Sequence, residues 1–106
     1  MNNVKNMISK EEYKVIYNFL KSLNKWYDSE NITYDNLTKK YYDRLIKNIT
    51  GLISSYKKNE YIDVIYCLQL IRNNMYNLME DYRKDNKRRY KSFKKIYDLL
   101  LDIENK

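Results

Sequence analysis

Apolar residues recur at steps of three and four positions along four segments of the chain, and polar residues fill the positions between them. This period is that of an amphipathic helix, which buries one face and exposes the other. The pattern predicts helices over residues 9–28, 37–58, 60–82 and 86–104.

The start of the first helix is marked by a capping box, Ser9-Lys10-Glu11-Glu12. In such a box the serine oxygen accepts the backbone N–H of Glu12, and the glutamate side chain accepts that of the serine. The helix ends in turn-forming residues at positions 28–31. We expect Ile32 and Tyr34, in the following connection, to fold back under the other helices.

The third helix has the longest and widest apolar stripe, so we expect it to lie at the centre of the fold. Gly51, inside the second helix, predicts either a close approach by a neighbouring helix or a kink. The apolar residues that best repeat at helical spacing are predicted to share one core: Phe19, Leu23, Leu45, Ile49, Leu68, Met75, Leu78, Phe93, Ile96 and Leu100.

The composition supports an all-α fold. The chain has no proline and one glycine among 106 residues, whereas sheets and tight turns use these two residues as punctuation. A chain of this length builds one core. We therefore predict a single helical domain, residues 1–106, folded as a four-helix bundle with short connections.

Some apolar residues lie beyond the predicted core stripes. They widen the apolar arcs of the third and fourth helices more than one packed face requires, and monomers seldom expose such patches. We predict that these residues bind a protein partner or a second copy of the chain: Ile62, Leu70, Leu99 and Leu101.

Positive charge is concentrated where the third and fourth helices meet. Residues 83–95 hold eight cations and one anion, so their net charge of +7 equals that of the whole chain. The pattern predicts an anion-binding surface, either for nucleic-acid phosphates without sequence readout or for an acidic partner; a solvated helix face is the alternative. The predicted phosphate-binding residues are Arg83, Lys84, Lys87, Arg88, Arg89, Lys91, Lys94 and Lys95, of which Lys84, Lys87, Arg88, Lys91 and Lys95 are expected on one helix face.

The chain has 13 tyrosines, and several lie partly off the core stripes. Exposed aromatic rings can stack on the bases of single strands, and tyrosine also suits protein interfaces. We favour the interface role for the off-stripe residues Tyr13, Tyr17, Tyr41, Tyr66 and Tyr76.

Candidate chemistry is sparse. There is no histidine, and Cys67 is the only cysteine; its apolar surroundings favour a buried, inert thiol. Without a base, a nucleophile motif or a glycine-rich phosphate loop, we expect a non-enzymatic protein with no cofactor, no metal and no small-molecule substrate. We expect no membrane association and a cytoplasmic location, in the host cell if the protein is viral.

Five stretches of the chain form an ordered series, at residues 15–20, 28–31, 37–45, 68–75 and 97–100. Together they resemble the helical domain of the GINS family of DNA-replication factors, in the archaeal type whose helical domain comes first. The resemblance implies a non-enzymatic scaffold subunit that packs against partner subunits. Two departures are the missing β domain and a third helix that keeps only Arg72 of the family's arginines.

The alternative function is that of a small viral or mobile-element protein that coats DNA or inhibits a host nucleic-acid machine. Small size, abundant lysine and tyrosine, and the lack of catalytic residues fit it equally well. A regulatory helical module, such as a toxin–antitoxin component, is a third class. A fold alone does not decide between these functions.

Overall fold

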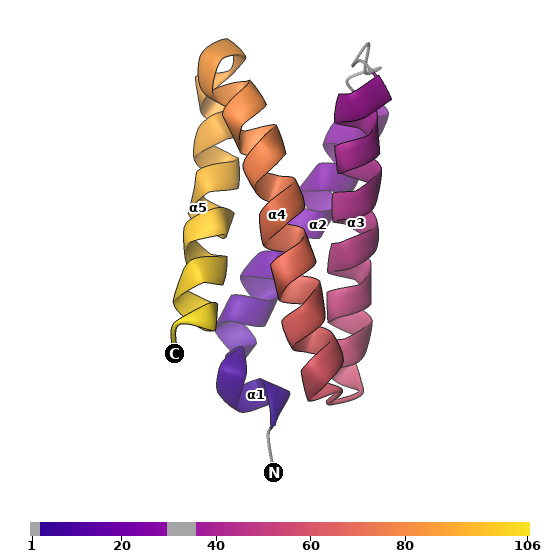
Figure 1. Cartoon of the computed structure of the whole chain (residues 1–106), viewed down its shortest axis with the longest axis vertical. Coiled ribbons are helices and arrows are strands. Elements are labelled where there is room, and N and C mark those ends of the chain that lie inside the picture. The colour runs from indigo at the N-terminus through magenta and orange to yellow at the C-terminus, as the bar shows by residue number, and fades with distance from the viewer. Residues whose placement is uncertain (1–2, 30–35) are drawn as a thin grey trace.

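The protein is a bundle of four long helices with a short helix at one end (Figure 1). A computed structural model describes residues 3–29 and 36–106. The helices are α1 (Val4–Met7), α2 (Lys10–Ser29), α3 (Asn36–Lys57), α4 (Tyr61–Asp85) and α5 (Lys87–Glu104). This confirms the predicted all-α class. The expectation for Ile32 and Tyr34 lies outside the described residues.

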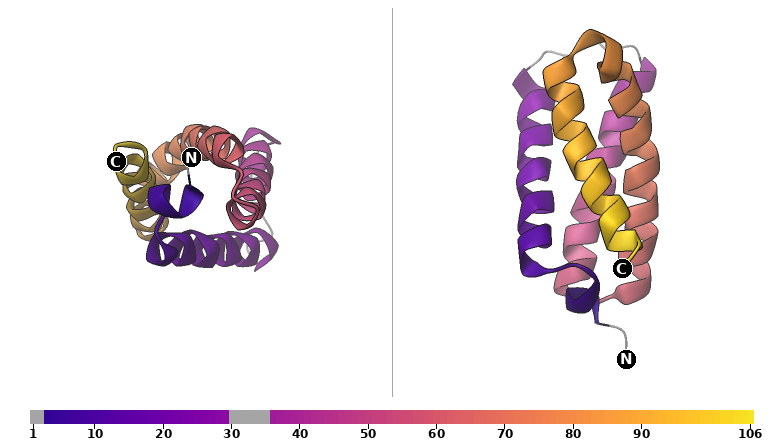
Figure 2. Two further views of the ribbon diagram at one scale, coloured as in Figure 1. Left: turned by 90° about the horizontal axis from the view of Figure 1, so that it is seen from below. Right: turned by 90° about the vertical axis from the view of Figure 1, so that its left-hand side faces the viewer.

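The long helices run alternately up and down along a bundle that measures 45 × 20 × 19 Å (Figure 1). Viewed from one end, they form a square in which α4 lies between α3 and α5, and α2 closes the fourth side (Figure 2). This is the arrangement expected when short connections make sequential helices antiparallel neighbours.

The core runs the length of the bundle. All ten residues predicted to share it are buried in one cluster. Near the end where α4 meets α5, the Phe93 ring is fully buried among other rings, with centroids 5.4 Å from Phe19, 6.1 Å from Trp26, 6.3 Å from Tyr42 and 5.3 Å from Tyr82. The buried hydroxyls of Tyr42 and Tyr82 hydrogen-bond to each other, which removes the cost of burying them unpaired.

The opposite end is closed by α1, which the periodicity did not predict because it is a single turn. Val4 and Ile8 are buried in the core. Asn59, at the α3–α4 turn, has a φ of 57°, and its side-chain oxygen accepts the Val4 backbone N–H at 2.9 Å. The capping box then starts α2 as predicted: Glu12 accepts the Ser9 N–H at 2.8 Å, and the Ser9 hydroxyl accepts the Glu12 N–H at 3.1 Å.

Gly51 lies where α3 packs against α4. The helix is continuous through this position. A Cβ atom added here would lie 3.5 Å from the Cys67 sulfur, an ordinary van der Waals contact. Cys67 itself is half-buried, and burial raises the pKa of its thiol.

Candidate nucleic-acid interface

The predicted phosphate-binding residues lie at the sharp turn between α4 and α5, and we call this set of eight residues the basic corner. Asn86 makes the turn. Its backbone N–H donates to the Tyr82 carbonyl at 2.9 Å and ends α4, and its side-chain oxygen accepts the Arg89 N–H at 3.0 Å and starts α5. Seven of the eight cations are exposed, and Arg89 is half-buried.

The helix boundaries correct one prediction about this surface. α4 continues to Asp85 rather than ending near residue 82, because Tyr82 is buried against Phe93 and keeps this last turn packed. Lys84 therefore lies on α4 and not on the same helix face as Lys87. The remaining four, Lys87, Arg88, Lys91 and Lys95, do share the outer face of α5, at steps of three and four residues.

Arg89 differs from the other cations of the basic corner. It falls on the inward side of α5, and its guanidinium carbon lies 3.7 Å from the centre of the Trp26 ring on α2. Burial lowers the pKa of Arg89. A cation over an aromatic face is attracted by the ring quadrupole, so this residue anchors the start of α5 to the end of α2.

Two cations of the basic corner already have acidic neighbours on their own helices. Arg83 lies 3.6 Å from Glu80, and Lys94 hydrogen-bonds Asp98 at 2.8 Å, which raises the pKa of Lys94. Within the described residues, five cations of the basic corner are exposed and have no ion pair: Lys84, Lys87, Arg88, Lys91 and Lys95.

The position of these charges is unfavourable for the isolated helix. The first turn of α5 holds Lys87, Arg88 and Arg89 and no acidic residue. The N-terminus of a helix carries partial positive charge, so each cation placed there costs up to about 1 kcal/mol when exposed. An anion bound at this turn would interact favourably with the cations and with the helix terminus together.

α3 is a second basic element, which the sequence analysis missed. It holds five exposed cations and one anion: Lys39, Lys40, Arg44, Lys47, Lys57 and Asp43. The total charge outside residues 83–95 is zero only because acidic residues on α4 and the end of α5 offset α3. Counting charge helix by helix would have revealed it.

The start of α3 lies at the same end of the bundle as the basic corner (Figure 1). A hollow of 680 Å³ lies between them, with Thr38 of α3 on one side and Lys84 and Asp85 of α4 on the other. Lys39 and Lys40, near the start of α3, therefore lie at the same end of the molecule as the basic corner, whereas Lys57 ends α3 at the opposite end.

The predicted partner interface does not form one exposed patch. Only Ile62 is strongly exposed, at 73%. Leu70, Leu99 and Leu101 are half-buried, and Leu99 packs against the core. Because Leu99 and Leu101 are two residues apart on a helix, they lie about 200° apart on opposite flanks of α5.

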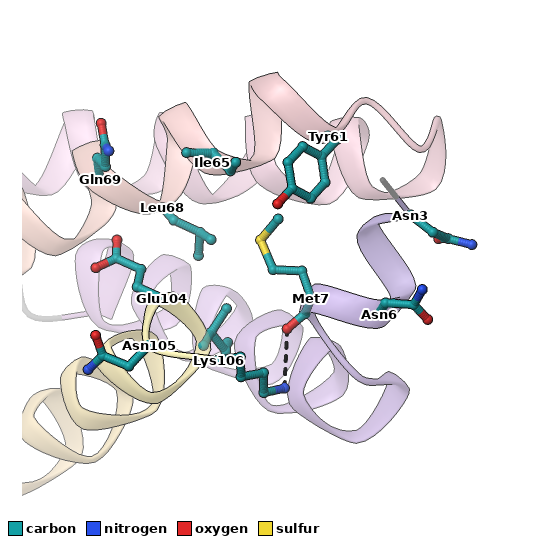
Figure 3. Close-up of a pocket in the computed structure, with 11 residues that line it drawn as sticks. Asn3, Asn6, Met7, Tyr61, Ile65, Leu68, Gln69, Glu104, Asn105 and Lys106 are labelled. Carbon is teal, nitrogen blue, oxygen red and sulfur yellow. Dashed lines mark hydrogen bonds between the residues drawn. The ribbon is translucent and has the colours of Figure 1, made fainter. Parts of the chain in front are cut away.

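A second hollow lies at the end of the bundle away from the basic corner, between α1, the start of α4 and the end of α5 (Figure 3). It has a volume of 630 Å³ and mixes amides such as Asn6 and Gln69 with the apolar Met7 and Ile65. Glu104, at its rim, is 3.0 Å from Arg72. Lys106 donates to the Met7 carbonyl at 3.2 Å and to Glu12, so the charged groups here are neutralised within the molecule.

Comparison of the chain with protein-family models, with curated sequences and with solved structures finds no match. Among the described residues, no helix has both the length and the apolar character needed to cross a membrane.

Proposed function

We propose that this protein is a non-enzymatic nucleic-acid-binding module that holds phosphates at its basic corner. The observation that carries the proposal is the set of five exposed cations without an ion pair among the described residues, which extends from Lys84 at the end of α4 to Lys95 on α5. Four of them repeat along one face of α5 and repel one another by a few tenths of a kcal/mol per pair. A row of phosphates relieves both this repulsion and the unfavourable charge at the helix terminus.

Binding of this kind reads charge and not sequence. Each phosphate contact releases counterions, so the logarithm of the binding constant falls with the logarithm of the salt concentration, by about 0.9 per contact on duplex. We expect similar affinities for duplexes of unrelated sequence and a steep dependence on salt.

Two double variants test the proposal, because each removes two charges from the same short segment. Lys87→Gln with Lys91→Gln removes two exposed cations without ion pairs, whereas Arg83→Gln with Lys94→Gln removes two that already have acidic neighbours. Fluorescence anisotropy with labelled duplex should show a salt slope smaller by up to about 1.8 for the first pair and a smaller change for the second. Equal losses would contradict a specific role for the unpaired cations.

A second function, self-association, is favoured by the outer face of α4. Ile62 and Tyr66, one turn apart, are 73% and 61% exposed. Between Asp63 and Glu80 the only charged residue of α4 is Arg72, which is paired with Glu104. Interface cores are depleted of charge and enriched in aromatic residues. On a molecule of charge +7, this neutral face is where a second copy meets the least repulsion.

We propose an antiparallel pair of α4 helices, which places the two basic corners at opposite ends of the dimer. Light scattering should report a dimer for the parent and a monomer for Ile62→Lys with Tyr66→Lys. Val15→Lys, at an exposed apolar residue of α2, is the control and should stay dimeric. A monomeric parent at high concentration would exclude this pairing. The replication-scaffold role implied by the GINS resemblance stays a prediction.

A further inference from the structure

The outer face of α2 carries four lysines, Lys10, Lys14, Lys21 and Lys25, which we call the lysine track. At about 100° per residue they lie within an arc of about 60°, and at 1.5 Å per residue they span about 22 Å of the helix. All four are exposed, and none has an ion pair in the described part of the chain. Their spacing repeats the pattern of like charges on α5. The sequence analysis, which compared net charges, did not identify α2 as a basic surface.

Tyr17 lies in the middle of the lysine track and is 37% exposed. The ring is held in place from the protein side: its centroid is 6.4 Å from that of Tyr13, whose ring in turn stacks on Tyr56 at 4.4 Å. The Lys21 ammonium lies 4.9 Å from the centre of the Tyr17 ring. The tyrosine is thus an oriented ring with cations on both sides along the helix.

The lysine track leads to the basic corner. Lys25 directly precedes Trp26, which is covered by Arg89 of α5. The end of α2 and the start of α5 lie at the same end of the bundle, with the two helices side by side (Figure 2). A chain of phosphates that follows α2 from Lys10 to Lys25 therefore runs toward the end of the bundle where α5 begins.

We propose that the outer face of α2 binds single-stranded nucleic acid: the lysine track contacts phosphates, and one base stacks on Tyr17 in the place of the Lys21 ammonium. The inference rests on the proposed nucleic-acid function and gives it a preferred substrate. Single-strand binding combines a positively charged path with aromatic stacking surfaces, whereas the bases of a duplex are already stacked on each other. A membrane fits less well, because the apolar face that would insert is buried in the bundle.

Anisotropy with labelled oligo-dT of about 20 nucleotides, set against a duplex of the same length, tests this inference. The track variant replaces the four lysines by Gln, and the corner variant replaces Lys87, Arg88, Lys91 and Lys95 by Gln. We expect the track variant to lower the salt slope for oligo-dT by up to about 2.8, at about 0.7 per contact, and to leave duplex affinity within about twofold of the parent.

Stacking is tested separately, by a change that removes no charge. Tyr17→Leu should weaken oligo-dT binding by about fivefold to 150-fold, the range for loss of one stacked base, and leave the salt slope unchanged. Tyr17→Phe keeps the ring and should bind like the parent. Circular dichroism checks that each variant keeps its helices.

The outcomes separate this inference from the proposed function. If the parent binds neither oligo-dT nor duplex, the nucleic-acid function itself is overturned. If the corner variant loses duplex affinity while the track variant binds oligo-dT like the parent, only the track is overturned. Equal losses by the track variant on oligo-dT and duplex, or normal oligo-dT binding by Tyr17→Leu, would remove the preference for single strands. If the track variant lost binding only to vesicles that contain anionic phosphatidylserine, the outer face of α2 would be assigned to a membrane.

Discussion

The two ends of the bundle differ in whether their charged side chains form ion pairs. At the end closed by α1, ionic groups from distant parts of the chain pair with each other: Arg72 with Glu104, and Lys106 with Glu12. At the basic corner, five exposed cations have no ion pair in the described structure. Both ends bury apolar residues fully, so the difference lies in the surface and not in the core. The ion pairs at the α1 end hold distant parts of the chain together, whereas the five cations of the basic corner remain available to a partner.

The largest effect expected concerns the core beneath the basic corner. Phe93→Ala removes a fully buried ring that contacts four others, and it should lower the free energy of unfolding by about 3–5 kcal/mol. Urea denaturation measures the loss. Tyr76→Ala, at a ring 49% exposed, is the control and should lose far less. A loss below about 1 kcal/mol for Phe93→Ala would contradict this packing.

The opposite end is tested by Ile8→Ala, because Ile8 is buried where α1 closes the bundle. We expect a loss of about 2–4 kcal/mol by urea denaturation. Lys10→Ala, at an exposed neighbouring residue, should change stability by less than about 0.5 kcal/mol. If Ile8→Ala behaved like the control, α1 would not be part of the folded core.

A pH dependence should arise from Glu12 at the paired end. Burial alone raises the pKa of this carboxyl, but the Lys106 ammonium and the Ser9 N–H and hydroxyl outweigh it and hold the pKa below its usual value of 4.5. Because the folded pKa is lowered, the stabilisation is present above the unfolded pKa and is lost as pH falls through the folded value.

Glu12→Gln keeps the capping box but removes this titration. Thermal melts should show the variant less stable than the parent by up to about 1 kcal/mol at neutral pH, with the difference shrinking below pH about 4. The same gap at all pH values would show that the carboxylate charge contributes nothing.

The smallest effect contrasts the two ends directly, through charge reversal of one lysine at each. Lys87→Glu places an anion at the N-terminus of α5, four residues before Lys91, and should raise stability by about 0.3–1 kcal/mol while weakening nucleic-acid binding. Lys106→Glu removes the ion pair with Glu12 and should lower stability by a similar amount. Thermal melts measure both changes in stability. If both substitutions lowered stability, the basic corner would have a stabilising role in the fold.

The helices and the core follow from the sequence because helical periodicity is local. An apolar residue at every third or fourth position specifies a buried face wherever the neighbouring helix lies, and each of the ten predicted core residues is buried. The cap at Ser9 could also be predicted from the sequence, because its hydrogen-bond donors and acceptors lie within one turn. The single turn of α1 is too short to produce a periodic pattern, and its closing contacts come from Asn59 and Tyr56, far along the chain.

The candidate site could be predicted only in part from the sequence. The sequence alone determined that cations concentrate in residues 83–95, because composition requires no folding. Arg83 and Lys94 pair with acidic residues three and four positions away on their own helices, whereas the tertiary structure decided where Arg89 and Lys84 lie. Arg89 is placed on Trp26 by the packing of α5 against α2, and Lys84 stays on α4 because Tyr82 is held in the aromatic cluster. The role of each charge depends on what lies within a few ångströms of it, and only the folded chain determines those neighbours.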